Sequence, residues 1–189
     1  MSSPFQSGAP SMDDSLSSEP LSSGPSELTS VFVYGTLMPG ERWESVARQG
    51  GEYQAQMAQL GGVVLADLRP EGYPALFEEP QASSVVHGWL YTYTAASWPR
   101  ALPFLDDLEG LHLSPPLYQR VRVSVQTADG LAPAWVYLYA RPGRRQAPGF
   151  VPVVSGRWAD VPERHLEGPR QTWETPEDEG GGPTSGLGA

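Results

Sequence analysis

A short apolar strand that runs into a glycine turn is the feature that most constrains this chain. The stretch 31–40 (VFVYGTLMPG) begins with three apolar residues and follows thirty residues rich in Ser and Pro. A β-branched and aromatic run bounded by Gly and Pro is typical of a short buried strand. Gly35 lets the backbone turn without a Cβ penalty, and such a turn leaves backbone N–H groups that can hold an anion or an oxyanion. The pattern also fits an ordinary exit from a strand into a loop.

Composition divides the 189-residue chain into an apolar centre and two polar ends. Residues 1–30 contain eleven Ser and four Pro, and a segment with so few large apolar residues cannot offset its chain entropy by burial. The other end closes with an acidic, Gly-rich run (EDEGGGP). We therefore expect disordered tails at 1–29 and 166–189, on either side of one folded domain at 30–165.

The negative charge is concentrated in the two ends. Of a formal net charge of −10, the centre (residues 31–162) contributes only −2, from twelve acidic and ten basic groups. A nearly neutral centre argues against nucleic-acid binding. The chain has no cysteine, which excludes disulfides and thiolate catalysis, and its three histidines show no metal-ligand spacing.

Neither a membrane span nor a secretory leader is expected. No apolar run approaches the roughly 18 residues that a transmembrane helix needs. The first basic residue is Arg42, so the positively charged start of a signal peptide is missing. We expect a cytoplasmic protein that does not bind membranes.

Strand patterns outnumber helical patterns in the centre by about two to one. After the opening strand, strands are expected at 52–68 (one long strand with a bulge at paired glycines), 73–77, 85–94, 117–127 and 132–140, with a further short element at 151–161. The last two long strands form a hairpin around residues 128–130. Helical composition is confined to 41–48 and 94–110. The expected fold class is α+β (mixed α/β): a small mixed, largely antiparallel β-barrel with flanking helices.

The second helical segment carries an unusual carboxylate. Because Pro103 removes a helical hydrogen bond, we expect a short first turn and a better-formed helix over about 103–109. Trp98, Leu102 and Leu105 would form the apolar face. Glu109 falls only about 20° from Trp98 on a 3.6-residue helix.

Glu109 is thus the one carboxylate of three in this segment that is expected to face the core. Asp106 and Asp107 lie off the apolar face, where water would solvate them. Burial without a partner raises the pKa of a carboxyl, which then stays neutral or acts as a base near pH 7. The alternative is a Glu at a fraying helix end that leans into water or pairs with an Arg.

Five short motifs occur in an order that resembles the γ-glutamylcyclotransferase superfamily, and more narrowly its AIG2-like branch, which includes γ-glutamylamine cyclotransferase. They are YGTL (34–37), GYPAL (72–76), HG with LY (87–91), LDDLEG (105–110) and YQRV (118–121). A late SGRW (155–158) is similar to the family's closing Ser-Gly-x-Trp. The resemblance spans about residues 31–160.

This resemblance implies a small mixed β-barrel and a catalytic base. In the family, the YGTL turn holds the glutamyl group of a γ-glutamyl substrate, and the Glu of the D-x-x-E-G motif is the general base. Carried over, Glu109 would take a proton from the substrate α-ammonium. The freed amine would then attack the γ-carbonyl and release 5-oxoproline with an amine or amino acid. N–H groups of Gly35, Thr36 and Leu37 would hold the α-carboxylate or the oxyanion.

Tyr34 and Tyr118 are the remaining candidate substrate-binding residues, through their hydroxyls, and each fits equally well as an aromatic side chain packed in the core. The resemblance implies a small-molecule γ-glutamyl substrate, no cofactor and no metal, and leaves the oligomeric state open. Two alternative functions stand beside it. One is removal of a γ-glutamyl protecting group from a biosynthetic intermediate, and the other is a non-catalytic binding protein on the same fold.

The chain departs from the family pattern at two places. Family members often carry an Asn a few residues after YGTL, where this chain reads MPGERWE (38–44). The connection 111–116 between the Glu motif and the YQRV strand is also longer than usual. Because both segments flank the expected pocket, substrate preference is the property least transferable from the family.

Overall fold

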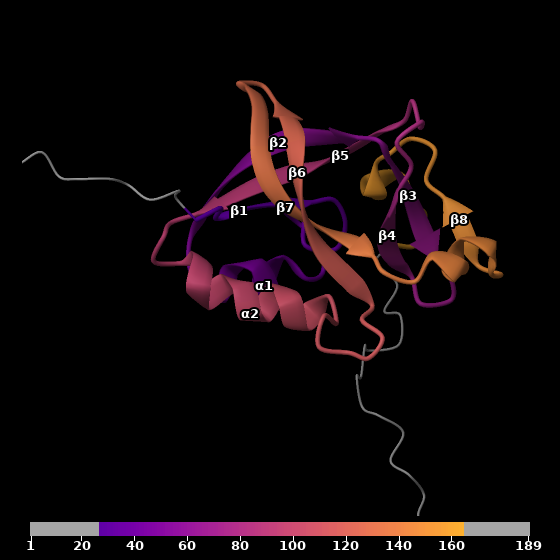
Figure 1. Ribbon diagram of the computed structural model, residues 1–189, viewed down its shortest axis with the longest axis horizontal. Helices are drawn as coiled ribbons and strands as arrows, with labels where there is room; N and C mark the ends of the chain where they lie inside the picture. Colours follow the sequence, from indigo (N-terminus) through magenta and orange to yellow (C-terminus); the bar gives the residue numbers. More distant parts are fainter. Residues whose placement is uncertain (1–26, 165–189) are drawn as a thin grey trace, which may run out of the picture.

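Five strands close into a barrel in the order β1–β5–β2–β6–β7 in this computed structural model, which describes residues 27–164 (Figure 1). The strands are β1 Ser30–Val33, β2 Tyr53–Gly61, β5 Val85–Tyr93, β6 Tyr118–Thr127 and β7 Gly130–Tyr139. Neighbours are antiparallel except β1 and β7, which pair in parallel at Val31 and Trp135. The predicted α+β fold with a small, largely antiparallel barrel is confirmed. Of the tails predicted to be disordered, 1–29 and 166–189, the residues 1–26 and 166–189 lie outside the described residues. The prediction is wrong for the end of the first tail, because the Leu28 carbonyl accepts from Trp135 Nε1 (3.0 Å) and the Thr29 hydroxyl donates to the carbonyl of Tyr93 (2.9 Å).

A second, three-stranded sheet lies beside the barrel (Figure 1). Its order is β4–β3–β8, with β3 Val63–Leu68, β4 Tyr73–Glu78 and β8 Phe150–Pro152. The expectation of one long strand over 52–68 is therefore wrong. Gly62 adopts a positive φ of 72°, which redirects the chain so that β2 joins the barrel and β3 joins the second sheet.

Two α-helices pack against each other along one side of the barrel (Figure 1). They are α1 Glu44–Arg48 and α2 Trp98–Leu108, and two short 3₁₀ helices follow, η1 Pro142–Gln146 and η2 Trp158–Asp160. The first helix begins three residues later than expected, because Trp43 N–H donates to the carbonyl of Thr36 (2.9 Å) and holds residues 38–43 in turns. Within residues 27–164, no helix is long and apolar enough to cross a membrane.

The second helix runs without a break through Pro103, contrary to the expectation of a short turn followed by a separate helix. Pro103 lies on the exposed side, as does Pro99, whose carbonyl loses its helical donor there. Water can take the place of that donor. The opposite side buries Trp98, Ala101 and Leu105, and this burial offsets the cost of the proline.

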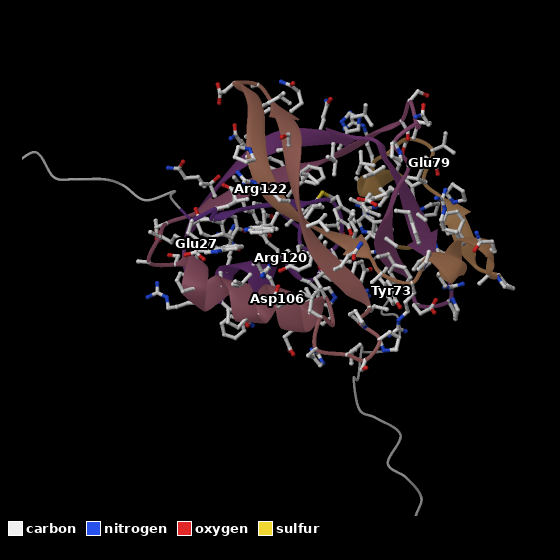
Figure 2. All side chains as sticks on the ribbon, viewed as in Figure 1. Glu27, Tyr73, Glu79, Asp106, Arg120 and Arg122 are labelled. Atoms are coloured by element: carbon white, nitrogen blue, oxygen red, sulfur yellow. The ribbon has the colours of Figure 1, made fainter. Side chains whose placement is uncertain are left out.

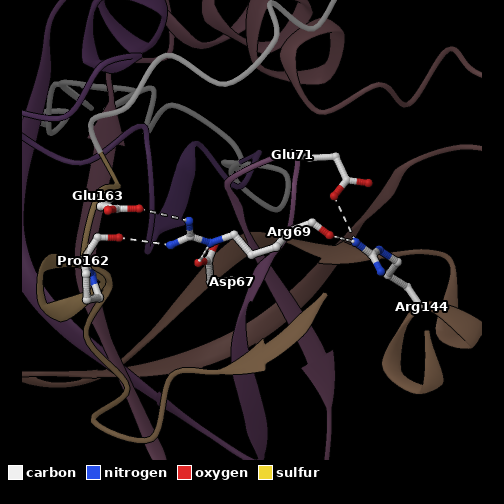
Figure 3. A network of polar contacts seen from close by, with 6 residues as sticks. All are labelled: Asp67, Arg69, Glu71, Arg144, Pro162 and Glu163. Carbon is white, nitrogen blue, oxygen red and sulfur yellow. Dashed lines mark hydrogen bonds and ion pairs between the residues drawn. The ribbon is translucent and has the colours of Figure 1, made fainter. Parts of the chain in front are cut away.

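Paired arginines brace the turn that leads into β4 (Figure 3). Arg69 pairs with the buried carboxylate of Asp67 and donates to the carbonyl of Pro162 (3.0 Å). Arg144 donates to the carbonyl of Arg69 (2.6 Å) and to the carboxylate of Glu71 (2.9 Å). These contacts tie three loops together just before the first residues of β4.

Candidate active site

A pocket lies where the end of β1, the start of β4 and the end of α2 meet. It holds about 480 Å³ of empty space, part of it open to solvent. The lining residues are Phe32, Val33, Tyr34, Gly35, Thr36, Leu37, Arg42, Trp43, Tyr73, Pro74, Leu108, Glu109, Tyr118 and Tyr137.

All six residues that were predicted from the sequence to form the site line this one pocket. They are Tyr34, Gly35, Thr36, Leu37, Glu109 and Tyr118. They come from three places that are far apart along the chain: the turn after β1, the end of α2 and the start of β6. The barrel brings them together because β1 and β6 both lie next to β7.

Glu109 is the residue that follows the last turn of α2, and its N–H still donates to the carbonyl of Leu105 (3.1 Å). Burial raises the pKa of Glu109 to about 8, and the negative charge of Asp106 adds to the rise. The residue keeps some exposure, because it lines the pocket. A carboxyl with this pKa can both take and return a proton near neutral pH.

Asp106 is half-buried and bonded within the fold, so the expectation that water solvates it is met only in part. Its two oxygens accept from Arg120 Nη1, each at 2.7 Å, and Oδ1 also accepts from the hydroxyl of Tyr137 (2.6 Å). The side chain of Asp106 is 28% exposed, against 74% for Asp107, which water does reach as expected. Figure 2 shows Asp106 on α2 facing Arg120 on β6. The difference arises because the Asp106 side of α2 packs against the barrel.

The two candidate tyrosines already use their hydroxyl protons. Tyr34 donates to the carbonyl of Tyr137 (2.7 Å), and Tyr118 donates to the carbonyl of Pro74 (2.6 Å). Burial raises the pKa of both hydroxyls well above the usual value, and the negative charge of Glu109 contributes to each rise. Both therefore stay protonated. The backbone of Leu76 already hydrogen-bonds to the oxygen of Tyr34, whereas the oxygen of Tyr118 has no such bond and can accept one from a ligand.

The turn after β1, whose residues line the pocket, contains N–H groups without hydrogen-bond partners. Its carbonyl groups are used: Gly35 accepts from Met38 N–H (3.0 Å), and Thr36 accepts from Trp43 N–H (2.9 Å). The N–H groups of Thr36 and Leu37 donate to no backbone or side-chain acceptor within residues 27–164. Successive N–H groups that point into one space form an anion-binding site.

Gly35 allows this turn to lie directly against β4. A Cβ at this position would come within 2.1 Å of Pro74 Cγ, a distance that no side chain tolerates without a shift of its neighbours. The glycine is therefore required by the close approach of the turn to one wall of the pocket. The conformational freedom expected from the sequence is not what requires it, because Gly35 has no positive φ.

Several lining residues were not nominated from the sequence. Tyr73 and Pro74 belong to the GYPAL motif, and the place of this motif among the family motifs could have identified them as site residues. Arg42 lies in the segment that departs from the family pattern. Tyr137 sits in a uniformly apolar strand and carried no signal. Within the described part of the chain, no group of three or more His, Cys, Asp or Glu side chains is placed to hold a metal ion.

Comparison with known proteins agrees with this architecture. A sequence profile of the family described as gamma-glutamyl cyclotransferase, AIG2-like, matches residues 31–160. The chain therefore belongs to the AIG2-like gamma-glutamyl cyclotransferase family, which confirms the resemblance deduced from its motifs.

Relatives and solved structures extend the comparison. The Homo sapiens protein gamma-glutamylaminecyclotransferase is 34% identical over 107 residues, which cover 54% of this chain and 65% of the human protein. The match thus spans just under two thirds of that relative. An AIG2-like protein from Mus musculus superimposes with a TM-score of 0.55 at 24% identity, over 72% of this chain and 92% of the mouse chain. An uncharacterized Pyrococcus horikoshii protein gives 0.50 at 16% identity, over 72% and 95% of the two chains. Both structures show the shared fold.

Proposed function

We propose that this protein is an enzyme that cyclises the γ-glutamyl group of a γ-glutamyl amine or γ-glutamyl amino acid to 5-oxoproline. Glu109 is its general base. The observation that carries the proposal is a carboxyl with a pKa of about 8 in a pocket that is also lined by the turn after β1, with its unpartnered N–H groups. Similarity to the human gamma-glutamylaminecyclotransferase supports the same class of reaction.

The raised pKa of Glu109 suits the first proton transfer. An α-amino group has an ordinary pKa of about 7.7–8.0, close to the value of about 8 for Glu109. Transfer of a proton from the substrate α-ammonium to Glu109 is therefore nearly balanced in energy. A carboxylate of ordinary pKa would be a much weaker base toward the same ammonium.

The freed amine attacks the γ-carbonyl carbon of the same molecule. A new C–N bond closes the five-membered ring, and the original γ-amide C–N bond breaks. The ring nitrogen gives up its second proton, and the departing nitrogen leaves as an ammonium after accepting two protons, one of them returned by Glu109. Because nucleophile and electrophile share one molecule, the main task of the pocket is to fold the substrate into a reactive shape.

Donors and acceptors of the pocket match the charged groups of the glutamyl end. The N–H groups of Gly35, Thr36 and Leu37 hold the α-carboxylate or the tetrahedral oxyanion. The hydroxyl oxygen of Tyr118 accepts from the α-ammonium and keeps it near Glu109. This arrangement follows from the hydrogen bond that Tyr118 already donates to a carbonyl group.

Of the two alternative functions, only the non-catalytic one predicts a different role for Glu109. Removal of a γ-glutamyl protecting group uses the same base and the same cyclisation with a larger leaving group. A non-catalytic binding protein has no need for a carboxyl whose ionisation the fold opposes. The raised pKa of Glu109 favours the two enzymatic readings.

The test measures 5-oxoproline release from a panel of γ-glutamyl amines and dipeptides by the wild type and by Glu109→Gln. We expect the variant to lose about 10²- to 10⁴-fold in turnover, the usual contribution of a positioned base. Asp107→Asn is the matched control, because Asp107 is exposed on the same segment, and it should retain nearly full activity. No release from any substrate, or equal release by the Glu109 variant, would contradict the proposal.

A further inference from the structure

A second cavity lies between the paired strands β2 and β5 and the segment that leads into η2. It has a volume of about 570 Å³, within the range of about 300–1,000 Å³ that is usual for small-molecule sites. It shares no lining residue with the candidate active-site pocket. The proposed function therefore leaves this cavity without a role.

The register of β2 and β5 builds one wall of the cavity. Met57 lies opposite Trp89, and Gln59 lies opposite His87. Residues that face each other across two strands share a face, and so do alternate residues along a strand. Met57 is 74% exposed, so this shared face is the outside of the barrel. The two strands thus hold these four side chains in fixed relative positions.

The segment before η2 forms the opposite wall. The carbonyl of Gly156 accepts from His87 N–H (2.9 Å), which fastens this segment to β5. Gly156 has a positive φ of 66°, and a Cβ there would lie 2.0 Å from the carbonyl oxygen of Val85. The close approach that this glycine permits places Trp158, which is fully buried, in the lining.

Two side chains of the lining have hydrogen-bonding capacity that the fold does not use. Trp158 Nε1 is buried and has no hydrogen-bond partner within residues 27–164. Buried N–H groups are almost always bonded, and an oxygen of a ligand at this wall would supply the missing acceptor. Burial and the nearby Arg157 lower the pKa of His87. Its imidazole is therefore neutral near pH 7 and can donate one hydrogen bond.

The charge of the lining is positive. Arg157 is the one charged side chain among the described residues that line the cavity, and it forms no ion pair within residues 27–164. The nearest acidic residues along the chain, Asp129 and Asp160, are exposed and lie outside the lining. Asp160 affects the pKa of His87, but less than burial and Arg157 do. An anion fits this set of charges, and a cation does not.

We propose that this cavity is a second ligand-binding site and that its ligand is a small aromatic carboxylic acid. The ring packs among Met57, Trp89 and Trp158, since indole and thioether groups favour aromatic partners. The carboxylate pairs with Arg157 and accepts the N–H of His87. This site is independent of the proposed function, because none of its residues belongs to the candidate active site.

Three probes that differ in one group test the proposal on the full chain. They are 3-phenylpropionate, its neutral analogue 3-phenylpropanol, and propionate, which lacks the ring. Calorimetry gives Kd for each with the wild type, Arg157→Gln, Arg157→Lys and Trp89→Ala. The indole N–H signal of Trp158 in a ¹H–¹⁵N NMR spectrum reports where the probe binds. Arg122→Gln is the matched control, since Arg122 is an exposed arginine on β6 outside the lining of both pockets (Figure 2).

We expect the wild type to bind 3-phenylpropionate about 3- to 10-fold more tightly than 3-phenylpropanol, a modest factor because Arg157 is exposed to water. Arg157→Gln should bring the acid and the alcohol close to parity, and Arg157→Lys should keep part of the difference. Trp89→Ala should weaken both ring compounds, and propionate should bind to none of the proteins. The Trp158 signal should shift with bound acid, and Arg122→Gln should behave as the wild type.

Several results would overturn the proposal. They are an absence of binding by 3-phenylpropionate up to its solubility limit, equal binding of acid and alcohol by the wild type, and a preference that Arg157→Gln leaves unchanged. Loss of acid binding in Arg42→Gln but not in Arg157→Gln would place the acid in the candidate active site instead. A wild-type dimer that binds no acid and that Met57→Arg dissociates would assign this face to a second copy of the chain.

Discussion

Arg120 donates through Nη1 to both carboxylate oxygens of Asp106 at 2.7 Å, three residues before the candidate base. The hydroxyl of Tyr137 reaches the same carboxylate at 2.6 Å. These bonds fasten α2 to β6 and β7 at the point where Glu109 meets the pocket. They also hold a negative charge close to Glu109, and that charge helps to keep its carboxyl protonated. The ion pair of Asp106 and Arg120 therefore holds α2 against the barrel, and the charge of Asp106 contributes to the raised pKa of Glu109.

Replacing Asp106 by Asn should lower the pKa of Glu109. The substitution removes the negative charge that opposes ionisation and leaves Arg120 as an uncompensated cation nearby. The pH dependence of kcat/KM should rise with a midpoint near 8 in the wild type and at lower pH in Asp106→Asn. Unfolding in urea should show a loss of about 1–3 kcal/mol from the weakened ion pair. Asp107→Asn is the control, and an unmoved midpoint in Asp106→Asn would contradict the electrostatic role.

Glu109→Gln should stabilise the protein at high pH. The folded-state pKa of about 8 lies above the ordinary 4.5, so the stability linked to the bound proton is fully present below about pH 4.5. It is lost as the pH rises through 8. Gln cannot ionise and escapes that loss. The gain at pH 9 relative to pH 5 should be about 2–3 kcal/mol, less than the full pKa shift implies because Glu109 keeps some exposure.

Urea unfolding of both proteins at the two pH values measures this difference. A gap between wild type and Glu109→Gln that does not change from pH 5 to pH 9 would show that the carboxyl ionises normally in the folded protein.

Tyr118→Phe should affect stability and substrate binding together. Loss of the hydroxyl leaves the buried carbonyl of Pro74 without its donor, at a cost of about 1–3 kcal/mol. The substrate ammonium also loses an acceptor, so KM should rise by about 5- to 10-fold with little change in kcat. Tyr93→Phe is the matched control, because it removes a buried hydroxyl bonded to the carbonyl of Ala47 (2.8 Å) outside the pocket. An unchanged KM in Tyr118→Phe would restrict Tyr118 to packing.

Gly35→Ala should destabilise the fold and impair the pocket. The new Cβ would lie 2.1 Å from Pro74 Cγ and 2.8 Å from Pro74 Cβ. Relieving this clash displaces either the turn or β4, at a cost of about 1–3 kcal/mol, and moves the N–H groups that face the substrate. Gly143→Ala is the control, since a Cβ there meets nothing within 4 Å. Thermal unfolding and KM measured on both variants check the prediction, and equal behaviour of the two would contradict it.

Most of the fold could be predicted because its strands and turns follow from local sequence patterns. The hairpin of β6 and β7 follows from β-branched alternation before the turn at residues 128–130 and an apolar run after it, and both strands form within two residues of the expected bounds. The long strand expected at 52–68 failed at Gly62, because a glycine in a strand pattern fits either a bulge or a redirection. Which of the two occurs depends on the sheets that the flanking segments join.

The site could be predicted to a similar extent. Helical periodicity placed Glu109 toward the interior, and it lines the pocket with a raised pKa. The same periodicity placed Asp106 in water, because it describes one apolar face and ignores what lies beside that face. Nothing in the sequence identified Arg42 as a pocket residue except its place in the segment 38–44, which departs from the family pattern.

The sequence by itself determined the positions of most strands, the turn after β1, the family and the carboxylate to examine, because residue type and spacing act locally. Only the tertiary structure decided which charges are paired and which are not. Asp106 meets Arg120 and Tyr137 across 14 and 31 residues of chain, while Arg42 meets no carboxylate within the described residues. Pairing of charges depends on which strand faces which helix, and that arrangement exists only once the barrel has closed.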